Sequence, residues 1–328
     1  MSPSDNAETT PADHHQGSWS APDPDRYRQI SVPVRGGELR VGIWEPAGTP
    51  TNGAKAPADG ATVPTVIAVH GVTSSHRAFL ALAGTLTEFR VVAPDLRGRG
   101  GSRELAGPFG MAQHADDIVA LMDFLEIDTA VLVGHSMGGF VTVALHGRHP
   151  ERVGSMVLVD GGLPLPAPAG ISDDELTTAR LGLAKQRLSM TFPDRESYRT
   201  FWRAHPALAA DWSPVVEDYV DYDLVGDAPN LRSATAFEAM ADDSVDLQNG
   251  GEWLLAALDG LPTPTPFLRA ERGMADEPVG LYPPEWIDGW QQRVPAVQVR
   301  DVLGVNHYTI LFNDIGVSAV AAAVRAAF

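Results

Sequence analysis

The ten residues AVLVGHSMGG at positions 130–139 are the stretch of sequence that decides the fold. The apolar run at 130–133 is typical of a buried strand, and residues 138–149 have a helical composition. Between them stands Gly-x-Ser-x-Gly, whose two glycines permit a turn so sharp that the serine takes a strained backbone conformation. Such a turn brings the Ser136 hydroxyl to the carboxyl edge of the sheet, with the backbone N–H of Met137 facing the same space. We therefore expect Ser136 to be a nucleophile.

Around this stretch, short apolar runs alternate with segments of helical composition. Strands are predicted at 65–69, 90–93, 130–133, 155–159, 266–269 and 296–299, and helices at 79–86, 111–125, 138–149 and 319–327. Continuous apolar strands are typical of a parallel sheet covered by helices on both faces. Segments 29–34 and 38–44, around Gly36-Gly37, predict an antiparallel hairpin before it. The predicted fold class is α/β, a mostly parallel central sheet of about eight strands flanked by helices.

Residues 163–262 interrupt this alternation, because they are richer in acids and aromatics and predict helices. Ser172-x-x-Glu175 is a capping-box pattern, and Ser213-Pro214 places a cap before a proline at the first helical position. We expect a disordered polar tail over 1–25, a core domain over 26–162 and 263–328, and an inserted helical cap over 163–262. The aromatic residues of the cap form either its own core or an apolar pocket above Ser136.

The composition excludes several kinds of site. The 328 residues contain no cysteine, which removes disulfides, Cys-ligated zinc, iron–sulfur clusters and thiol nucleophiles. A net charge of −18 repels phosphate backbones and anionic lipid, so no nucleic-acid or membrane partner is expected. Residues 1–16 lack a basic start and an apolar run, and no apolar stretch reaches about 18 residues. We therefore expect a cytoplasmic protein, whose oligomeric state the sequence does not indicate.

Three further motifs stand in order around the serine turn. His70-Gly71 follows the strand predicted at 65–69, APDLRGRGGS at 93–102 follows the next strand, and Asn306-His307-Tyr308 lies beyond the last one. Together with Gly-x-Ser-x-Gly, these motifs resemble the α/β-hydrolase superfamily over residues 26–328, where the cap matches only in position and size. The resemblance implies a serine hydrolase that needs no metal or organic cofactor.

A serine hydroxyl needs a base that removes its proton, and a histidine on a loop at the same sheet edge fits that role. Among ten histidines, His307 follows the strand predicted at 296–299, with 301–306 as a connecting loop, and precedes the final helix. We assign His307 as the base. His135 lies inside the serine turn, and we expect its side chain to point away from Ser136.

Two backbone N–H groups should stabilise the oxyanion of the reaction. The serine turn supplies Met137, and the residue after His70-Gly71 supplies Val72. Asp95 corresponds to a landmark of the superfamily, and we expect it to be structural, with salt bridges offered by Arg97 and Arg99.

The acid that orients the histidine is open between three residues. The commonest superfamily position, beyond the strand at 266–269, holds glycine here, in Ala270-Glu271-Arg272-Gly273, and Asp276 lies three residues further on. Asp160 ends the strand at 155–159, a position that a subset of the superfamily uses. We favour Asp160, with Asp276 and then Glu271 as alternatives.

We expect cleavage of an ester or lactone through an acyl-enzyme, because an alkoxide leaves more readily than an amine. The aromatic cap favours a small to medium hydrophobic substrate. A hydrolase of C–C bonds in ring-cleavage products would use the same triad. In a different class, a ligand-binding receptor on this fold would keep the residues without turnover.

Overall fold

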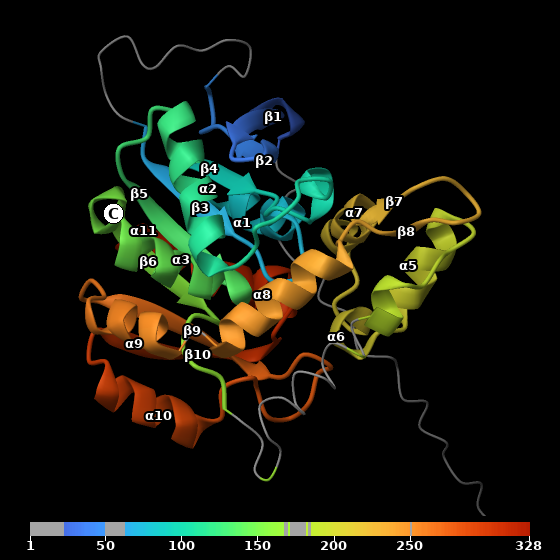
Figure 1. Cartoon of the computed structure of the whole chain (residues 1–328). Helices are drawn as coiled ribbons and strands as arrows, with labels where there is room; N and C mark the ends of the chain where they lie inside the picture. Colours follow the sequence, from blue (N-terminus) through green and yellow to red (C-terminus); the bar gives the residue numbers. More distant parts are fainter. Residues whose placement is uncertain (1–22, 50–62, 167–169, 171–181, 183–184, 250) are drawn as a thin grey trace, which may run out of the picture.

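The computed structural model describes residues 23–49, 63–166, 170, 182, 185–249 and 251–328. An eight-stranded sheet, in the order β1-β2-β4-β3-β5-β6-β9-β10, forms its centre (Figure 1). The strands are β1 (Tyr27–Val34), β2 (Gly37–Trp44), β3 (Thr65–Val69), β4 (Arg90–Pro94), β5 (Ala130–His135), β6 (Val153–Val159), β9 (Thr265–Arg272) and β10 (Val297–Asn306). The β1–β2 and β2–β4 pairs are antiparallel and the other pairs are parallel. The predicted α/β fold is confirmed.

Helices cover both faces of this sheet because its central strands are apolar on both. The first face packs on α1 (Leu80–Thr85) and α11 (Asp314–Ala326), and the second on α2 (Met111–Phe124), α3 (Met137–Arg148) and α10 (Pro284–Arg293). In β3, Val66 faces the first set and Ile67 the second, which is the two-residue period of a strand. Short 3-10 helices are η1 (Pro24–Arg26), η2 (His76–Phe79), η3 (Gly100–Ser102), η4 (Pro150–Arg152) and η5 (Thr309–Leu311).

The last strand is longer than the sequence indicated. Residues 301–306 were expected to form a loop, but β10 continues to Asn306, with an irregularity in its register to β9 after Val302. The expectation was wrong because β10 is an edge strand, where polar side chains can face solvent while the backbone still pairs. Asp301, for example, pairs with Arg269 of β9 at 2.6 Å. As a result, His307 follows β10 directly.

The segment between β6 and β9 is mostly helical. It contains α5 (Arg195–Arg203), α6 (Pro206–Ala209), α7 (Pro214–Tyr222), a hairpin of β7 (Leu224–Val225) and β8 (Arg232–Ser233), α8 (Phe237–Asn249) and α9 (Gly251–Asp259). Ser213 accepts a hydrogen bond from the Val216 N–H, which confirms the predicted start of α7. The Ser172–Glu175 pattern lies outside the described residues. None of the helices within the described ranges is long and apolar enough to cross a membrane.

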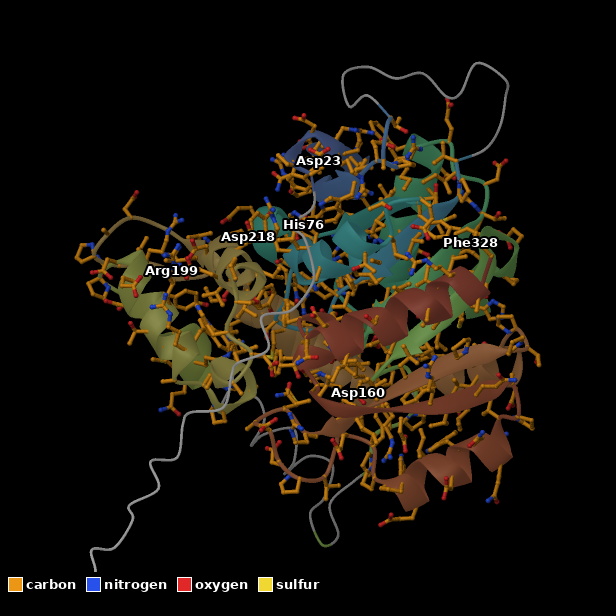
Figure 2. The ribbon with its side chains drawn as sticks, turned by 180° about the vertical axis from the view of Figure 1, so that it is seen from behind. Asp23, His76, Asp160, Arg199, Asp218 and Phe328 are labelled. Carbon is orange, nitrogen blue, oxygen red and sulfur yellow. The ribbon has the colours of Figure 1, made fainter. Side chains whose placement is uncertain are left out.

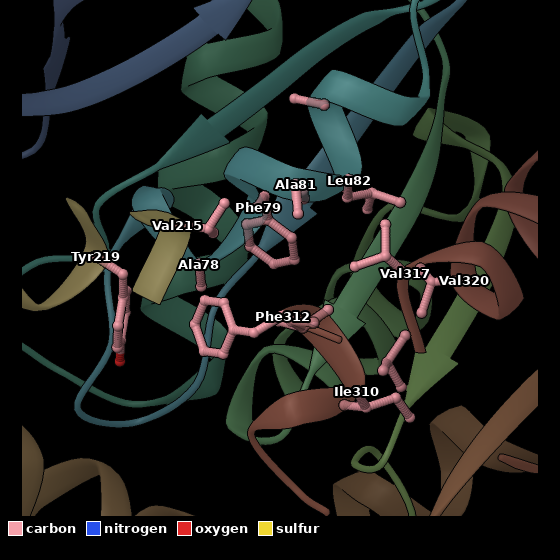
Figure 3. Close-up of a cluster of buried hydrophobic side chains, with 14 of the residues drawn as sticks. Ala78, Phe79, Ala81, Leu82, Val215, Tyr219, Ile310, Phe312, Val317 and Val320 are labelled. Atoms are coloured by element: carbon pink, nitrogen blue, oxygen red, sulfur yellow. The ribbon is translucent and has the colours of Figure 1, made fainter. Parts of the chain in front are cut away.

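This inserted segment contacts the core in two different ways. Helices α5 and α7 project to one side of the sheet, whereas α9 lies along its helical layer and packs against α3 (Figure 1). Figure 3 shows Val215 and Tyr219 of α7 beside Phe79 and Phe312, so an apolar cluster joins α7 to the core. The cap boundaries at 163 and 262 stay a prediction.

Candidate active site

Ser136 lies between the end of β5 and the start of α3, with backbone φ 55° and ψ −124°. A positive φ is strained for a residue other than glycine. A Cβ on Gly138 would lie 1.9 Å from the carbonyl oxygen of Val69. A Cβ on Gly161 would lie 2.0 Å from the carbonyl oxygen of Ser136, and a Cβ on Gly134 would lie 2.4 Å from the carbonyl oxygen of Gly138. The backbone therefore packs too closely here for side chains. The sharp turn expected from the sequence is present.

The two residues predicted to supply oxyanion N–H groups belong to segments next to the serine. Met137 begins α3, and the first N–H groups of a helix have no acceptor inside it and stand at the positive end of its dipole. Val72 follows Gly71 in the loop after β3, and a Cβ on Gly71 would lie only 3.4 Å from Ser136 Oγ. The loop that carries Val72 thus runs beside the serine hydroxyl. An oxyanion hole made of Val72 and Met137 stays a prediction.

A buried arginine fixes the loop that contains Val72. The Nε–H of Arg99 donates to the Val72 carbonyl at 2.9 Å, and its guanidinium pairs with Asp243 of α8 at 2.6 Å. Both charged side chains are fully buried. Asp243 also contacts His114 Nε2 at 3.0 Å. Helix α8 is therefore tied to the loop beside Ser136, a connection that the sequence did not indicate.

Asp95 has different partners from those expected. Its carboxylate contacts His76 Nδ1 at 2.8 Å and accepts a hydrogen bond from the Tyr222 hydroxyl at 2.7 Å. The expected salt bridges are wrong, because Arg97 pairs instead with Asp117 at 2.6 Å and Arg99 with Asp243. Burial acts to raise the pKa of Asp95, but the facing His76 outweighs it and holds that pKa at about 2.

This contact lies where the inserted segment meets the core. Tyr222 ends α7, and Asp218 on the same helix pairs with Arg77 at 3.3 Å. Figure 2 shows Asp218 and His76 at this junction, whereas Asp160 lies elsewhere, among the strands. Asp95 therefore anchors α7 to the core.

His307 and Asp160 form the closest contact between predicted site residues. His307 Nδ1 lies 2.7 Å from Asp160 Oδ2, and the side chains are 3% and 0% exposed. Asp160 immediately follows β6, with a positive φ of 46°, and its Oδ1 accepts the Ala270 N–H at 3.1 Å. Because a carboxylate can only accept, Nδ1 carries a proton, and in the neutral ring Nε2 then has the lone pair. That tautomer is the one a general base requires.

The two alternative acids are engaged elsewhere. Asp276 Oδ1 accepts from Arg272 Nε at 2.7 Å and from Asn306 Nδ2 at 2.9 Å. Glu271 accepts the Gly304 N–H at 2.7 Å. Neither carboxylate forms a hydrogen bond with the imidazole of His307. Of the three candidates, only Asp160 is in position to orient this ring.

The serine and the histidine are not joined by a hydrogen bond in the described part of the chain. Ser136 is half-buried, and its hydroxyl is not tied to another side chain within those ranges. Catalytic hydrogen bonds are often long before a substrate binds.

His135 supports the histidine loop. It was expected to point away from Ser136, and its ring lies against that of His307, with 4.8 Å between the centroids. Its Nε2–H donates to the His307 carbonyl at 2.8 Å. Burial, together with the nearby His307, lowers the pKa of His135 to about 3, so the ring stays neutral. No motif in the sequence indicated this contact.

Asn306 is a second support that the sequence did not single out, although it belongs to the late histidine motif. Its Oδ1 accepts the N–H groups of Tyr308 and Thr309 at 3.0 and 2.9 Å. Its Nδ2 donates to the Ala207 carbonyl of α6 at 2.9 Å. The inserted segment therefore contacts the histidine loop as well as the loop of Val72. Within the described ranges, no group of three or more His, Asp or Glu side chains could hold a metal ion.

Comparison with known proteins agrees with this fold. A family model of the alpha/beta hydrolase fold matches residues 64–209. Lipase LipV of Mycobacterium tuberculosis is 30% identical over 218 residues, which cover 59% of this chain and 79% of the lipase. The chain belongs to the α/β-hydrolase fold family.

Two further proteins resemble this chain, one in sequence over about a third of its length and one in structure over most of it. A 2-hydroxymuconate semialdehyde hydrolase of Pseudomonas putida is 35% identical over 108 residues, covering 32% of this chain and 38% of that hydrolase. The crystal structure of E-2-(acetamidomethylene)succinate hydrolase matches with a TM-score of 0.69 over 90% of this chain and 98% of that one, at 21% identity. The second similarity concerns the fold alone. The family and the two sequence relatives support a hydrolase.

Proposed function

We propose that this protein is a serine hydrolase that cleaves an ester or lactone of a small to medium hydrophobic substrate through an acyl-enzyme. The observation that carries the proposal is the 2.7 Å contact between the buried His307 Nδ1 and Asp160 Oδ2, at the sheet edge where Ser136 stands in its strained turn. Similarity to a lipase over 79% of that protein's length supports hydrolysis of an ester.

In the first half of the reaction, Ser136 Oγ attacks the carbonyl carbon while His307 Nε2 takes its proton. The carbonyl oxygen becomes an oxyanion that accepts hydrogen bonds from the N–H groups of Val72 and Met137. Removing one such donor typically costs about 3 kcal/mol in the transition state. The C–O bond then breaks, and His307 gives its proton to the departing alkoxide.

In the second half, a water molecule attacks the acyl-enzyme carbonyl and His307 Nε2 takes its proton. The bond to Ser136 Oγ breaks, the proton returns to the serine, and the carboxylic acid leaves. Asp160 keeps the imidazole in the productive tautomer and stabilises its protonated form in both halves. The protons balance over the cycle, and the net reaction is hydrolysis.

A fluorophosphonate probe tests this proposal. The wild-type protein should be labelled, and Ser136→Ala and His307→Ala should not be; Ser318→Ala, an exposed serine on α11, is the matched control and should label normally. Hydrolysis of p-nitrophenyl esters should follow the same pattern, with a loss of several orders of magnitude in kcat for His307→Ala. Absence of labelling in wild type would favour the non-catalytic receptor instead.

A second candidate is hydrolysis of a C–C bond in a ring-cleavage product. It is favoured by the similarity to 2-hydroxymuconate semialdehyde hydrolase, although this chain spans only 38% of that protein. A ring-cleavage dienol substrate, compared with p-nitrophenyl esters on the same preparation, separates the two. A much higher kcat/KM for the dienol would show that the enzyme hydrolyses a C–C bond instead of an ester. The cytoplasmic location stays a prediction from the residues at 1–16 and from the lack of a long apolar stretch. The absence of nucleic-acid and membrane partners stays a prediction from the net charge.

A further inference from the structure

Arg187 differs from the three arginines of α5 in the inserted segment. Arg232 of β8 also forms no ion pair within the described ranges, but its side chain is exposed to solvent, whereas that of Arg187 is half-buried. Arg195, Arg199 and Arg203 on α5 all form ion pairs with acids of the same segment, such as Asp221 at 3.1 Å from Arg195. Figure 2 shows Arg199 on this outer helix. The guanidinium of Arg187 forms no ion pair and no hydrogen bond with any residue in the described ranges.

The absence of a partner within the described part of the chain is informative because acids are abundant. The chain has 42 acidic residues against 24 basic ones, so a carboxylate would be easy to supply. Arg187 is also half-buried, in a helical turn at 185–188. A charge that is partly removed from water is costly unless an opposite charge compensates it. An arginine of this kind is suited to receiving a carboxylate or phosphate from outside the chain.

A series of neighbouring aromatic rings connects Arg187 with the proposed catalytic histidine, His307. The guanidinium carbon lies 5.8 Å from the centre of the Trp202 ring. The Trp202 ring is 5.3 Å from His205, His205 is 6.4 Å from Tyr308, and Tyr308 is 5.5 Å from His307. The cation is therefore on the side of the inserted segment that faces the histidine loop.

The charge of Arg187 also acts on two phenols of this region. Burial raises the pKa of Tyr308, beside His307, and of Tyr219, on α7, and the positive charge of Arg187 opposes both shifts. Tyr219 in turn interacts with Ser74, in the loop that carries Val72. The guanidinium is thus in electrostatic contact with side chains that flank both loops of the proposed catalytic site.

Two carboxylates of this region do not neutralise Arg187. Asp223 is occupied by the hydroxyl of Tyr198 at 2.5 Å and that of Ser233 at 3.0 Å, and burial raises the pKa of Asp223. Glu277 accepts the Ala275 N–H at 2.8 Å. The charge of Arg187 acts to lower the pKa of Asp223, but neither carboxylate forms an ion pair with the guanidinium. Within the described ranges, no acid therefore binds the guanidinium directly.

We propose that Arg187 binds a carboxylate carried by the substrate, so that the substrate is an ester or lactone whose acyl chain ends in a free acid. The aromatic side chains between Arg187 and His307 would contact the apolar body of that chain. This inference rests on the proposed function and gives it a substrate class. The alternative is that Arg187 merely stabilises the inserted segment through its cation–π contact with Trp202.

Matched pairs of esters test this charge preference. The p-nitrophenyl monoesters of adipic, pimelic and suberic acids are compared with p-nitrophenyl hexanoate, heptanoate and octanoate, in which a methyl group replaces the carboxylate. Three chain lengths are compared because the separation of Ser136 and Arg187 decides which acyl chain can reach both residues. Rates are corrected with Ser136→Ala, since these esters also hydrolyse spontaneously. The wild-type protein should prefer the charged member of at least one pair.

Substitution of Arg187 should change this preference selectively. Arg187→Met should lower the ratio of kcat/KM for the charged ester to kcat/KM for the neutral ester by about 10- to 100-fold. This is the usual size of the effect of one hydrogen bond to a charged group, and it should appear mainly in KM. Arg187→Lys should keep part of the preference. Arg195→Met, an exposed ion-paired arginine of the same segment, is the control and should leave the ratio unchanged. Thermal unfolding checks that each variant is folded.

A binding experiment separates this inference from the proposed function. Adipate, pimelate and suberate are titrated calorimetrically into Ser136→Ala, with and without Arg187→Met. At least one dicarboxylate should bind, about tenfold more weakly without Arg187. Such binding would support the anion site even if fluorophosphonate labelling disproved the hydrolase. Ester hydrolysis with an unchanged ratio, and dicarboxylate binding that is absent or independent of Arg187, would overturn the site and leave the hydrolase intact.

Discussion

Replacing Asp160 by asparagine is the sharpest test of how His307 is oriented. The carboxylate accepts the His307 Nδ1–H through Oδ2 and the Ala270 N–H through Oδ1. Asparagine at this position would keep its oxygen toward the Ala270 N–H and turn its NH2 group toward Nδ1. Two donors cannot face each other, so the imidazole should move its proton to Nε2. In that tautomer, His307 cannot accept the proton of Ser136.

The size of the effect follows from the loss of the correct tautomer. The equivalent change in the serine protease triad lowers kcat about 10⁴-fold. Because each factor of ten is 1.36 kcal/mol, that loss corresponds to about 5.4 kcal/mol of transition-state stabilisation. We expect a loss of about 10³- to 10⁴-fold for Asp160→Asn. Asp276 forms a partly exposed ion pair with Arg272 and accepts a hydrogen bond from Asn306, but it does not contact the His307 ring. Asp276→Asn should therefore change kcat less than about threefold.

The assay is kcat for p-nitrophenyl butyrate, together with the rate of fluorophosphonate labelling. Asp160→Asn, Asp276→Asn and Glu271→Gln are measured side by side, and thermal unfolding shows whether each is folded. A folded Asp160→Asn with near-normal kcat would refute the reasoning. A large loss confined to Asp276→Asn or Glu271→Gln would assign the orienting role to that residue instead.

Three further changes test other parts of the structure. Gly138→Ala should destabilise the fold by about 3 kcal/mol, because the new Cβ would lie 1.9 Å from the Val69 carbonyl oxygen. Gly289→Ala on α10 is the control and should leave stability unchanged, since its Cβ would have no neighbour within 4 Å. Urea unfolding measures both variants. Arg99→Met should lower the free energy of unfolding by about 3–5 kcal/mol, because it leaves the buried Asp243 without its opposite charge, and it should also slow ester hydrolysis. Arg148→Met removes an exposed pair with Asp116 and should lower the free energy of unfolding by less than about 1 kcal/mol. Burial lowers the pKa of His70 to about 4, and burial together with His307 lowers the pKa of His135 to about 3. Below pH 6.5 these two residues therefore bind protons in the unfolded chain but not in the folded chain. Stability should therefore fall as the pH decreases from 6.5 toward 4, and His135→Gln, which cannot titrate, should flatten that slope in thermal unfolding; an unchanged slope in this variant would contradict the assignment.

Much of the fold was predictable because it depends on short stretches of chain. The turn at 130–139 contains its own strand, glycines and helix start, and no distant residue is needed to recognise it. The apolar strand β3 was predicted with the bounds that it has in the structure, Thr65–Val69. Strand β10 was predicted too short, because an edge strand pairs through its backbone while several of its side chains face solvent.

Sequence by itself therefore determined the sheet, the serine turn and the late position of His307. It left Asp160, Asp276 and Glu271 as rivals, since each follows or ends a strand of the same sheet. Only the tertiary structure decided between them, by placing Asp160 against a ring 147 positions away in the chain. The same applies to Arg99 with Asp243 and to His135 with His307. Such contacts depend on the order of strands and the paths of loops between them, which local residue preferences do not encode.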